Sequence, residues 1–517
     1  MTASYNLSLL GSNYNQGGTG AVARTTASKL QESVSVKDFG AVGDGVTDDT
    51  AAIQAAVNAV TLLNGRSGVF FPAGVYSVKA TSTYSGAINI NSGLTLFGTN
   101  ATIKVAASSS VGTRTISINS NDVQILGLRF TPSTITDLTN VYLAATYSRL
   151  EIRGCEFVTP QSGALYVAGY SEDVLFTENK VYGLGYGILI ESTTGGTGYI
   201  VSNNVFVGSG ANDGDAIEFN VLTTAISNVT ISGNVIKSYI ASNASAGFGI
   251  GLSFVNECSV TGNVVKSCSR NGIHLENNCT DVTVTGNTVS DCRDAGIEVQ
   301  GENSGKQCYR VVISANVVKN CCLSPSTGLG RGSIDCGSSS GGTGYGVGSL
   351  IVSNNMVSSS HAAGIYTYEC RFSIITGNKV LDSVGGGIQV VTAVSSVISG
   401  NLCTDDQATK TQTYGLIVNG GVNDGSGTFL QISNNMLAGN LTGAVSDVTT
   451  GAVYFGNVGA DNWNSIGYQG GARKLGFFSL ATPISKPTVT GAKAANAALT
   501  SLLSQLAALG LVTDSST

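Results

Sequence analysis

The chain has 517 residues, a formal net charge of -6 at pH 7 and only 11% charged residues. Its 68 Gly and 6 Pro, with abundant Val, Ile, Thr and Ser, indicate short buried strands joined by tight turns and exclude a mainly helical or disordered protein. The acidic balance and the lack of basic clusters argue against a nucleic-acid partner. With neither a long apolar run nor an export signal, we expect no membrane insertion and synthesis in a cytoplasm.

The N-terminal part predicts an attachment segment followed by a capping helix. Residues 1–33 are polar and rich in Gly, Asn, Ser and Thr without periodicity, so we expect an arm that orders on a partner. The next segment can form a helix with an aspartate cap and one apolar face: Asp48 or Asp49, then Ile53, Val57 and Val60. We expect this helix to cover the open end of the structure that follows.

A short motif then recurs ten times: an Asn that lies between two runs of β-branched residues, as in ISGN or VTGN. The residues are Asn179, Asn204, Asn234, Asn263, Asn287, Asn316, Asn355, Asn378, Asn401 and Asn435. Their spacing of 23 to 39 residues is typical of one coil of a parallel β-solenoid. Gly or Asn precedes eight of them and adopts the left-handed conformation readily, which predicts a corner. We expect the Asn side chains to stack into a ladder of hydrogen bonds.

A second strand follows each Asn and supplies a buried column. Its apolar marker, mostly after Gly or Ala, recurs at Ile188, Ile217, Ile250, Ile273, Ile297, Ile334, Ile365, Ile388 and Leu416. This residue and the one two positions later point inward, because side chains alternate along a strand. Since parallel crossovers are overwhelmingly right-handed, we expect an all-β protein, a single-stranded right-handed parallel β-helix over residues 34–447. Its buried column should include Ile273, Ile297, Ile365 and Ile388.

The 11 Cys residues fit the same repeat. Three fall five residues after a ladder Asn and three fall eight residues before one: Cys268, Cys292 and Cys321, then Cys279, Cys308 and Cys370. Stacked columns of buried thiols therefore explain six of the eleven. The odd number and the absence of zinc-ligand spacing argue against disulfides and a metal site.

The C-terminal part predicts an assembly segment. Residues 448–485 are expected to form a β or irregular region, and residues 486–517 to contain a helix. One stripe of that helix carries Leu499, Leu502, Leu503, Leu506 and Leu509. An apolar stripe on a single polar-backed helix needs a partner.

The block VKDFGAVGDGVTDDTAAIQAAV, which begins at Val36, is similar to the N-terminal signature of the pectate-lyase-like right-handed β-helix superfamily, especially bacteriophage tailspikes and capsule depolymerases. Residues 16–40 resemble the adapter-to-helix junction of phage tail proteins, and residues 486–516 resemble tail-fibre C-termini. The resemblance implies a homotrimer in the virion tail, attached to the phage tail or another tail protein through residues 1–33. It also implies that the protein binds and cleaves a bacterial surface polysaccharide, a capsule or an O-antigen, without a cofactor.

Chemistry on this fold must come from the outward side chains of the second strand. The first outward residue in successive coils is Leu189, Glu218, Gly251, His274, Glu298, Asp335, Tyr366, Gln389 and Ile417. The second outward residue is Glu191, Asn220, Ser253, Glu276, Gln300, Gly337, Tyr368, Val391 and Asn419. One face thus concentrates carboxylates, which suit glycosidic cleavage.

Segment lengths between the Asn and the second strand predict two valleys on this face. The first has a floor of His274, Glu276, Glu298 and Gln300; the second holds Tyr366, Tyr368 and Gln389. Exposed aromatic rings suit the apolar faces of sugars, so we expect the tyrosines, Gln389, His274 and Gln300 to bind substrate.

The spacing of coils and strands ranks the carboxylates. Glu276 and Glu298 lie on a diagonal, about 8 Å apart at the backbone, and Glu298 and Asp335 share a column, about 5 Å apart. Inverting glycosidases hold their carboxyls about 6.5 to 9.5 Å apart and retaining ones about 5 to 5.5 Å apart, so stereochemistry stays open. We expect Glu276 and Glu298 to be the catalytic pair, with Glu218 and Asp335 as alternates.

Each assignment has a structural alternative. The acids can serve solubility, His274 can be a surface imidazole held by its neighbours, and the two tyrosines can form a trimer contact. Asp213 and Asp215, in GANDGDAIEF, are interpreted as part of a turn rather than as ligands of a substrate or cation.

Three functions remain open at this point. An endo-glycosidase is favoured by the carboxylates. A polysaccharide lyase acting on a uronate-containing capsule is supported by Arg270 and His274. A receptor-binding tail fibre without enzymatic activity would need only the tyrosine valley.

Overall fold

The computed structural model describes residues 13–459, 488–491, 496–508 and 513–516, with short internal gaps. The gaps are 31–32, 62–67, 81, 83–84, 107–113, 132–138, 145, 159–162, 184, 211–212, 222, 242–245, 302–305, 325–330, 339–346, 421–429 and 450–451.

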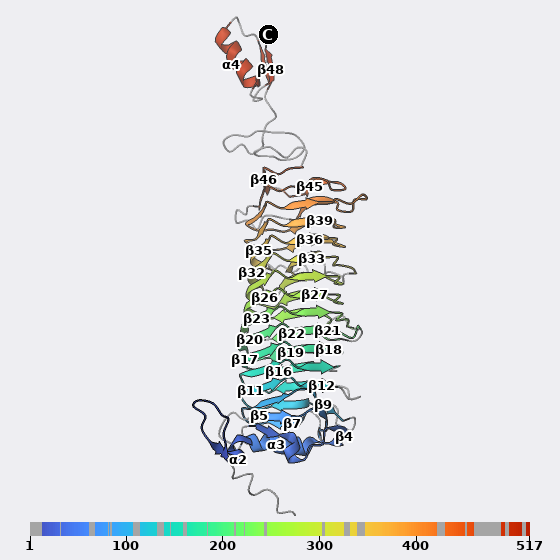
Figure 1. The fold of residues 1–517 in the computed structure, drawn as a ribbon. Coiled ribbons are helices and arrows are strands. Elements are labelled where there is room, and N and C mark those ends of the chain that lie inside the picture. Colours follow the sequence, from blue (N-terminus) through green and yellow to red (C-terminus); the bar gives the residue numbers. More distant parts are fainter. Residues whose placement is uncertain are drawn as a thin grey trace, which may run out of the picture.

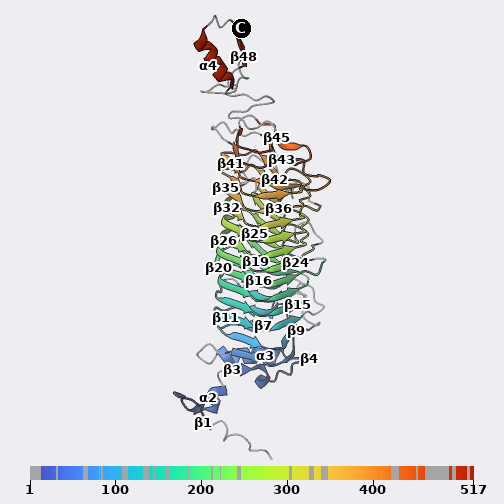
Figure 2. The same ribbon diagram turned by 45° about the horizontal axis from the view of Figure 1, so that its top comes forward.

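Three parallel sheets wind around one axis and form the right-handed parallel β-helix that the repeat predicts (Figure 1). In the described part of the chain, sheet 1 has 14 strands, from β7 (Gly86–Ile90) to β45 (Gly443–Asp447). Sheet 2 has 16 strands, from β3 (Ser33–Ser35) to β46 (Ala452–Phe455). Sheet 3 has 14 strands, from β4 (Asp44–Asp48) to β42 (Leu402–Thr404). A second view shows the coils stacked evenly along the axis (Figure 2).

One coil illustrates how the sequence directs the chain. Strand β26 (Val255–Thr261) of sheet 2 is followed by Gly262, whose φ of 65° turns the backbone. After Asn263 come β27 (Val264–Lys266) in sheet 3 and β28 (Ile273–Glu276) in sheet 1. The residue before each of the ten Asn has a positive φ, including Glu178 and Ala315, where the residue is neither Gly nor Asn. The solenoid thus imposes the corner even on residues that adopt it at an energetic cost.

The Asn residues form the predicted ladder inside this corner. Asn263 Nδ2 donates to Asn287 Oδ1 at 3.0 Å and to the Ile231 carbonyl at 2.9 Å. Its Oδ1 accepts from the backbone N–H of Asn234 at 3.0 Å. The pattern continues to Asn457, which accepts from Asn435 Nδ2 at 2.9 Å. Each coil therefore satisfies buried polar groups of its neighbours.

Columns of like side chains fill the interior. The expected column is confirmed, because its members pair in register and are at most 1% exposed: Ile273, Ile297, Ile365 and Ile388. All 11 Cys are buried free thiols, including the six that the repeat assigns to stacked columns. Nearer the N-terminus, rings stack at centroid distances of 4.9, 5.7 and 6.2 Å along Phe130, Phe157, Phe176 and Phe206.

Helix α3 (Thr50–Thr61) covers the first coils, as expected (Figure 1). Asp48 Oδ1 accepts from the N–H of Thr50 at 3.0 Å, at the first residue of the helix. Asp49 instead directs its carboxylate to two backbone N–H groups of the preceding loop, at 2.7 and 3.2 Å. The predicted apolar face is buried, at most 3% exposed: Ile53, Val57 and Val60.

The ends of the chain carry short elements. On the N-terminal side these are β1 (Asn13–Tyr14), β2 (Arg24–Thr25), α2 (Thr26–Leu30) and η1 (Val36–Phe39); on the C-terminal side they are β47 (Thr488–Gly491), α4 (Ala497–Ala508) and β48 (Thr513–Ser516). Solenoid pairing continues past residue 447, through β46, to a bridge between Met436 and Val458. Residues 460–487 and Leu509, on which part of the expected C-terminal division rests, lie outside the described residues. None of the described helices is long and apolar enough to cross a bilayer.

Candidate active site

Sheet 1 presents its outward side chains in columns that run along the solenoid. Its inner strands are β10 (Arg114–Ile118), β13 (Thr139–Leu143), β16 (Gly163–Ala168), β19 (Tyr186–Ser192), β22 (Ile217–Val221), β25 (Ile250–Ser253), β28, β31 (Ile297–Gly301), β34 (Gly332–Ser338), β37 (Ala363–Tyr368), β40 (Ile388–Val391) and β43 (Tyr414–Asn419). The register aligns Glu218, Gly251, His274 and Glu298, which is the first column expected from the repeat. The second expected column, through Asn220, Ser253, Glu276 and Gln300, is also observed.

A third column lies two residues before the buried Ile of each strand, and sequence reasoning missed it. It holds Tyr186, Asp215, Phe248 and Asn271, stacked through backbone bonds such as Gly187 N–H to the Asp215 carbonyl. The repeat contained the signal, since counting two residues back from Ile188, Ile217, Ile250 and Ile273 gives this column. The alternation that predicts the outward columns starts at the Ile, so it does not reach these residues.

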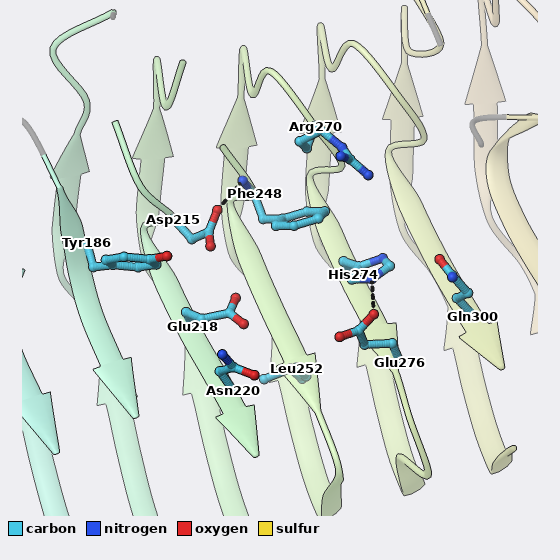
Figure 3. Close-up of a pocket in the computed structure, with 10 residues that line it drawn as sticks. All are labelled: Tyr186, Asp215, Glu218, Asn220, Phe248, Leu252, Arg270, His274, Glu276 and Gln300. Atoms are coloured by element: carbon cyan, nitrogen blue, oxygen red, sulfur yellow. Dashed lines mark hydrogen bonds and ion pairs between the residues drawn. The ribbon is translucent and has the colours of Figure 1, made fainter. Parts of the chain in front are cut away.

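The three columns together line a cavity of about 330 Å³ over strands β19 to β31 (Figure 3). Its lining consists of Tyr186, Asp215, Glu218, Asn220, Phe248, Leu252, Arg270, His274, Glu276 and Gln300. The carboxylates of Glu218 and Glu276 point toward one another across it (Figure 3). Of the residues expected in the first valley, the cavity therefore gathers His274, Glu276 and Gln300.

His274 lies between two carboxylates. Its Nε2 is 3.3 Å from Glu276 Oε2 and its Nδ1 is 2.8 Å from Glu298 Oε2. Burial opposes protonation of the imidazole, but the two carboxylates outweigh it and raise the pKa of His274 to about 10. His274 is therefore an imidazolium at neutral pH.

The charge of His274 acts back on Glu276. Burial favours the neutral carboxyl, but the hydrogen bond and charge of His274, helped by Lys306 and Arg270, lower the pKa of Glu276 below its ordinary value. Glu276 is thus held ionised at the cavity edge.

An aromatic ring supports His274 from the side. The Phe248 ring stacks on the imidazole with centroids 4.8 Å apart and planes 15° apart. The Arg270 guanidinium lies 5.1 Å from the Phe248 centroid, and its Nε is 2.8 Å from Asp294 Oδ2. Phe248 therefore separates two cations and fixes the plane of His274.

The opposite side of the cavity holds a second pair of acids. Asp215 Oδ1 accepts from the N–H groups of Gly247 and Phe248 at 2.6 and 2.7 Å. Burial nevertheless raises the pKa of Asp215 to about 6. Burial and the charges of Asp215 and Glu276 raise the pKa of Glu218 well above its ordinary value. This pair therefore retains a proton under conditions in which Glu276 is ionised.

Gly251 makes room for the Glu218 side chain. A Cβ atom at position 251 would lie 2.0 Å from Glu218 Oε2 and 3.1 Å from its Cδ. The place that a side chain of residue 251 would take, between Glu218 and His274, is therefore available to the Glu218 carboxylate.

Glu298, the expected partner of Glu276, has a different environment from the one we anticipated. It is only 1% exposed and contacts His274 and the Asn271 amide. A group this deeply buried beneath His274 can orient the imidazole but cannot reach a substrate. Proximity along the diagonal was correct, but an intervening imidazolium occupies the space between the two carboxylates.

Asp335 and the residues of the second valley also lie apart from the cavity. Asp335 is fully buried and pairs with Arg331, with 2.9 Å from Nη2 to Oδ1. The Arg331 guanidinium in turn lies 4.6 and 5.5 Å from the ring centroids of Tyr366 and Tyr368. Gln389 aligns with Tyr366 in the first column. These residues form a cluster of their own, outside the cavity.

The turn interpretation of the GANDGDAIEF segment holds for Asp213 and not for Asp215. Asp213 is a turn residue, because its carboxylate accepts from the N–H groups of Ser209, Gly210 and Ile240 at 2.9, 3.1 and 3.0 Å. Asp215, two residues later, lines the cavity. Within the described ranges, no three His, Cys, Asp or Glu side chains are arranged to hold a metal ion.

Comparisons with known proteins agree with this architecture. A family model described as rhamnogalacturonase A/epimerase, pectate lyase-like, matches residues 33–298. A mannuronan C5-epimerase of Azotobacter vinelandii, AlgE5, is 50% identical over 64 residues, which cover 12% of this chain and 6% of that protein. The tail spike protein of Shigella phage Sf6 is 42% identical over 74 residues, 14% of this chain and 12% of that protein. The chain thus spans only a small part of these curated relatives.

Among solved structures, tailspike protein 3 of bacteriophage CBA120 resembles the chain with a TM-score of 0.51 at 13% identity. The match covers 95% of this chain and 69% of that one. At this level of identity, the similarity supports the β-helix fold.

Proposed function

Because the chain belongs to the rhamnogalacturonase A/epimerase family of pectate-lyase-like proteins, we propose that it cleaves an internal glycosidic bond of a polysaccharide by hydrolysis. One observation supports hydrolysis as the type of reaction. Glu218 and Glu276 face one another across the cavity, with pKa values displaced in opposite directions (Figure 3). Two carboxyls kept in different protonation states supply the acid and the base of glycoside hydrolysis.

Each carboxyl has one role in this mechanism. Glu218, which holds its proton beside Asp215, protonates the oxygen of the leaving sugar as the glycosidic bond breaks. Glu276, kept ionised by His274, removes a proton from the water that bonds to the anomeric carbon. His274 orients Glu276 and is itself held by Glu298 and Phe248.

The backbone positions that carry the two carboxyls favour inversion of configuration. The Glu218 carboxylate reaches over Gly251, and coil and strand spacings put Gly251 and Glu276 roughly 8 Å apart at the backbone. Inverting enzymes need about 6.5 to 9.5 Å between carboxyls to admit a water molecule, whereas retaining enzymes need about 5 to 5.5 Å. We therefore expect a product with inverted anomeric configuration.

A lyase needs a His, Tyr, Lys or Arg base, and the candidates among the described residues of this cavity are already protonated or paired. His274 has a pKa of about 10 and is protonated at neutral pH, and burial raises the pKa of Tyr186 to about 12. Arg270 is engaged by Asp294. The negative charge of Glu276 and that of the Asp215 and Glu218 pair would also repel a uronate placed at the reacting position. Hydrolysis fits these charges better than β-elimination.

The biological setting belongs to the same proposal. Similarity to tailspikes and the tail-protein character of residues 16–40 support a homotrimeric tailspike that acts on a bacterial capsule or O-antigen. On this view residues 1–33 attach the protein to the phage tail, and the tyrosine cluster at Tyr366 and Tyr368 contacts the glycan.

The test is cleavage of purified capsules and lipopolysaccharides from a bacterial panel, with products sized and new reducing ends counted. On a cleaved polysaccharide, Glu218→Gln and Glu276→Gln should each lower turnover by roughly 10² to 10⁴, because each removes a proton-transfer group while preserving shape. Glu156→Gln, which changes a partly exposed acid on sheet 3, is the matched control and should retain activity.

Three outcomes would contradict the mechanism. An unsaturated product that absorbs near-ultraviolet light would indicate a lyase. Full activity of both Gln variants would remove these residues from the chemistry. Tight binding across the panel without any cleavage would support a receptor-binding fibre.

A further inference from the structure

We propose that sheet 1 binds a carboxylate-bearing segment of the polysaccharide at Arg114, at the far end of a tyrosine track that leads into the cavity. The track consists of Tyr142, Tyr166 and Tyr186. This inference rests on the proposed function and specifies its substrate: an acidic polysaccharide whose charged unit lies away from the cleaved bond.

The track occupies three consecutive strands of sheet 1. Tyr142 of β13 and Tyr166 of β16 pair in register, with ring centroids 5.5 Å apart and planes at 62°. Tyr186 of β19 follows at the edge of the cavity. All three are partly exposed, and their rings offer the apolar surface that sugar rings stack on. With coils about 4.8 Å apart, Tyr142 lies about 14 Å from Glu218 along the axis.

A neighbouring acid fixes the orientation of the Tyr166 side chain. The Tyr166 hydroxyl donates to Glu191 Oε2. Glu191 stands in the second column of the same sheet, on the strand that carries Tyr186. This hydrogen bond holds the Tyr166 ring beside that of Tyr142. The register aligns Tyr166 with Leu189, so Tyr186 lies three residues earlier on β19, and the track shifts along the strand before it reaches the cavity.

Arg114 gives the track a charge at its distal end. Its guanidinium carbon lies 3.2 Å from the Tyr142 ring centroid, and the side chain is partly exposed. The other arginines along this face are neutralised, Arg270 by Asp294 and Arg331 by Asp335, each at 2.8 to 2.9 Å. Among the residues that the structure describes, no carboxylate lies within ion-pair distance of Arg114. Its planar set of donors is matched to a carboxylate from outside the chain.

The charges of the cavity explain why the acidic unit should lie at a distance. The Asp215 and Glu218 pair carries one negative charge beside ionised Glu276. The cations of the cavity, His274 and Arg270, are already paired with carboxylates of the chain, so a further anion is disfavoured at the reacting position. Arg114, on β10 and four strands from Glu218 on β22, is a cation on this side of the cavity and would attract an anion. A chain with neutral sugars at the cleaved bond and an acidic sugar farther along satisfies both.

The experiment measures binding and cleavage separately. Capsules and O-antigens are immobilised, each native and after chemical reduction of its sugar carboxylates to alcohols, and binding of the full chain is measured in a Glu218→Gln background. Arg114→Met keeps an apolar stem and removes the charge, and Arg129→Met, on sheet 3, is the matched control. Thermal melting verifies that each variant is folded, and Tyr142→Leu tests the track independently.

We expect Glu218→Gln to bind native acidic polysaccharide about 10-fold to 100-fold more tightly than the reduced form. Arg114→Met should abolish that difference and Arg129→Met should preserve it, while Tyr142→Leu should weaken both forms equally. Binding confined to neutral polysaccharides, or an equal effect of Arg114→Met on both forms, would overturn the inference. Full cleavage activity of Glu218→Gln would contradict the proposed function. The comparison of binding to native and reduced polysaccharide would still test the site at Arg114.

Discussion

At the scale of single residues, Gly251 decides where the Glu218 carboxylate can lie. Any side chain at this position would meet Glu218 Oε2, which sits 2.0 Å from the place of a Cβ atom. Gly251→Ala should therefore displace the carboxylate while leaving the backbone intact, since position 251 has no left-handed φ. A shift of about 1 Å in a catalytic group can lower turnover by about 10². Steady-state kinetics with a melting curve check this prediction.

The matched control for this change is Gly443→Ala in β45, at the far end of sheet 1. A Cβ atom there meets only the Tyr414 ring, at 3.4 Å. Equal loss of activity in both variants, or unfolding of Gly251→Ala, would show that Gly251 serves the fold rather than the position of Glu218.

His274 sets the pH range of the proposed reaction. Activity should rise as Glu276 ionises, below the ordinary pKa of a glutamate, and fall as Glu218 loses its proton, well above that ordinary pKa. The charge of His274 lowers the pKa of all three acids. His274→Gln removes that charge, so both limbs of the pH profile should move to higher pH.

The pH profile of kcat/KM on a cleaved polysaccharide measures this shift. His361→Gln is the control, because the His361 side chain hydrogen-bonds with Asn320 Oδ1 at 3.1 Å and does not line the cavity. A lower kcat with unmoved limbs in His274→Gln would mean that the imidazole acts on structure alone.

At the scale of elements, the Asn ladder connects successive coils. Asn263→Ala would remove the acceptor of the Asn234 N–H and the donor to the Ile231 carbonyl, both in the buried interior. Each buried group left without a partner costs about 1 to 3 kcal/mol, so the free energy of unfolding should fall by several kcal/mol. Denaturant unfolding measures it.

Asn119→Ala is the comparison for the ladder, since the Asn119 side chain donates to Asn91 Oδ1 at 3.2 Å in an exposed setting. A loss in Asn263→Ala no larger than in Asn119→Ala would mean that water or backbone relaxation replaces the ladder bonds.

At the scale of the whole molecule, the apolar stripe of α4 calls for a partner. In the single chain, Leu499 and Leu502 are 40% and 55% exposed, and Leu503 is 7% exposed. If α4 packs against its copies in a trimer, deletion of residues 486–517 should convert the trimer to smaller species in a sedimentation experiment. An unaltered trimer after deletion would assign assembly to another part of the chain.

The repeat in the sequence was sufficient for the fold and for the register. The phase of each Ile marker identified the buried column at Ile273 and Ile297, and the first two outward columns followed from alternation. The capping helix followed equally well, because local apolar periodicity and an Asp cap are properties of neighbouring residues. These features depend on spacing within about one coil, so the sequence determines them directly.

The site needed the tertiary structure, because its chemistry depends on which side chains meet across coils. Alternation placed Glu298 and Glu276 close together, but only the packed coils show the His274 imidazolium between them and the burial of Glu298. Likewise Asp215 reads as part of a turn until its stacking over Phe248 brings it to Glu218. Burial and neighbouring charge set the protonation of each acid, and both are properties of the stacked coils rather than of any one repeat.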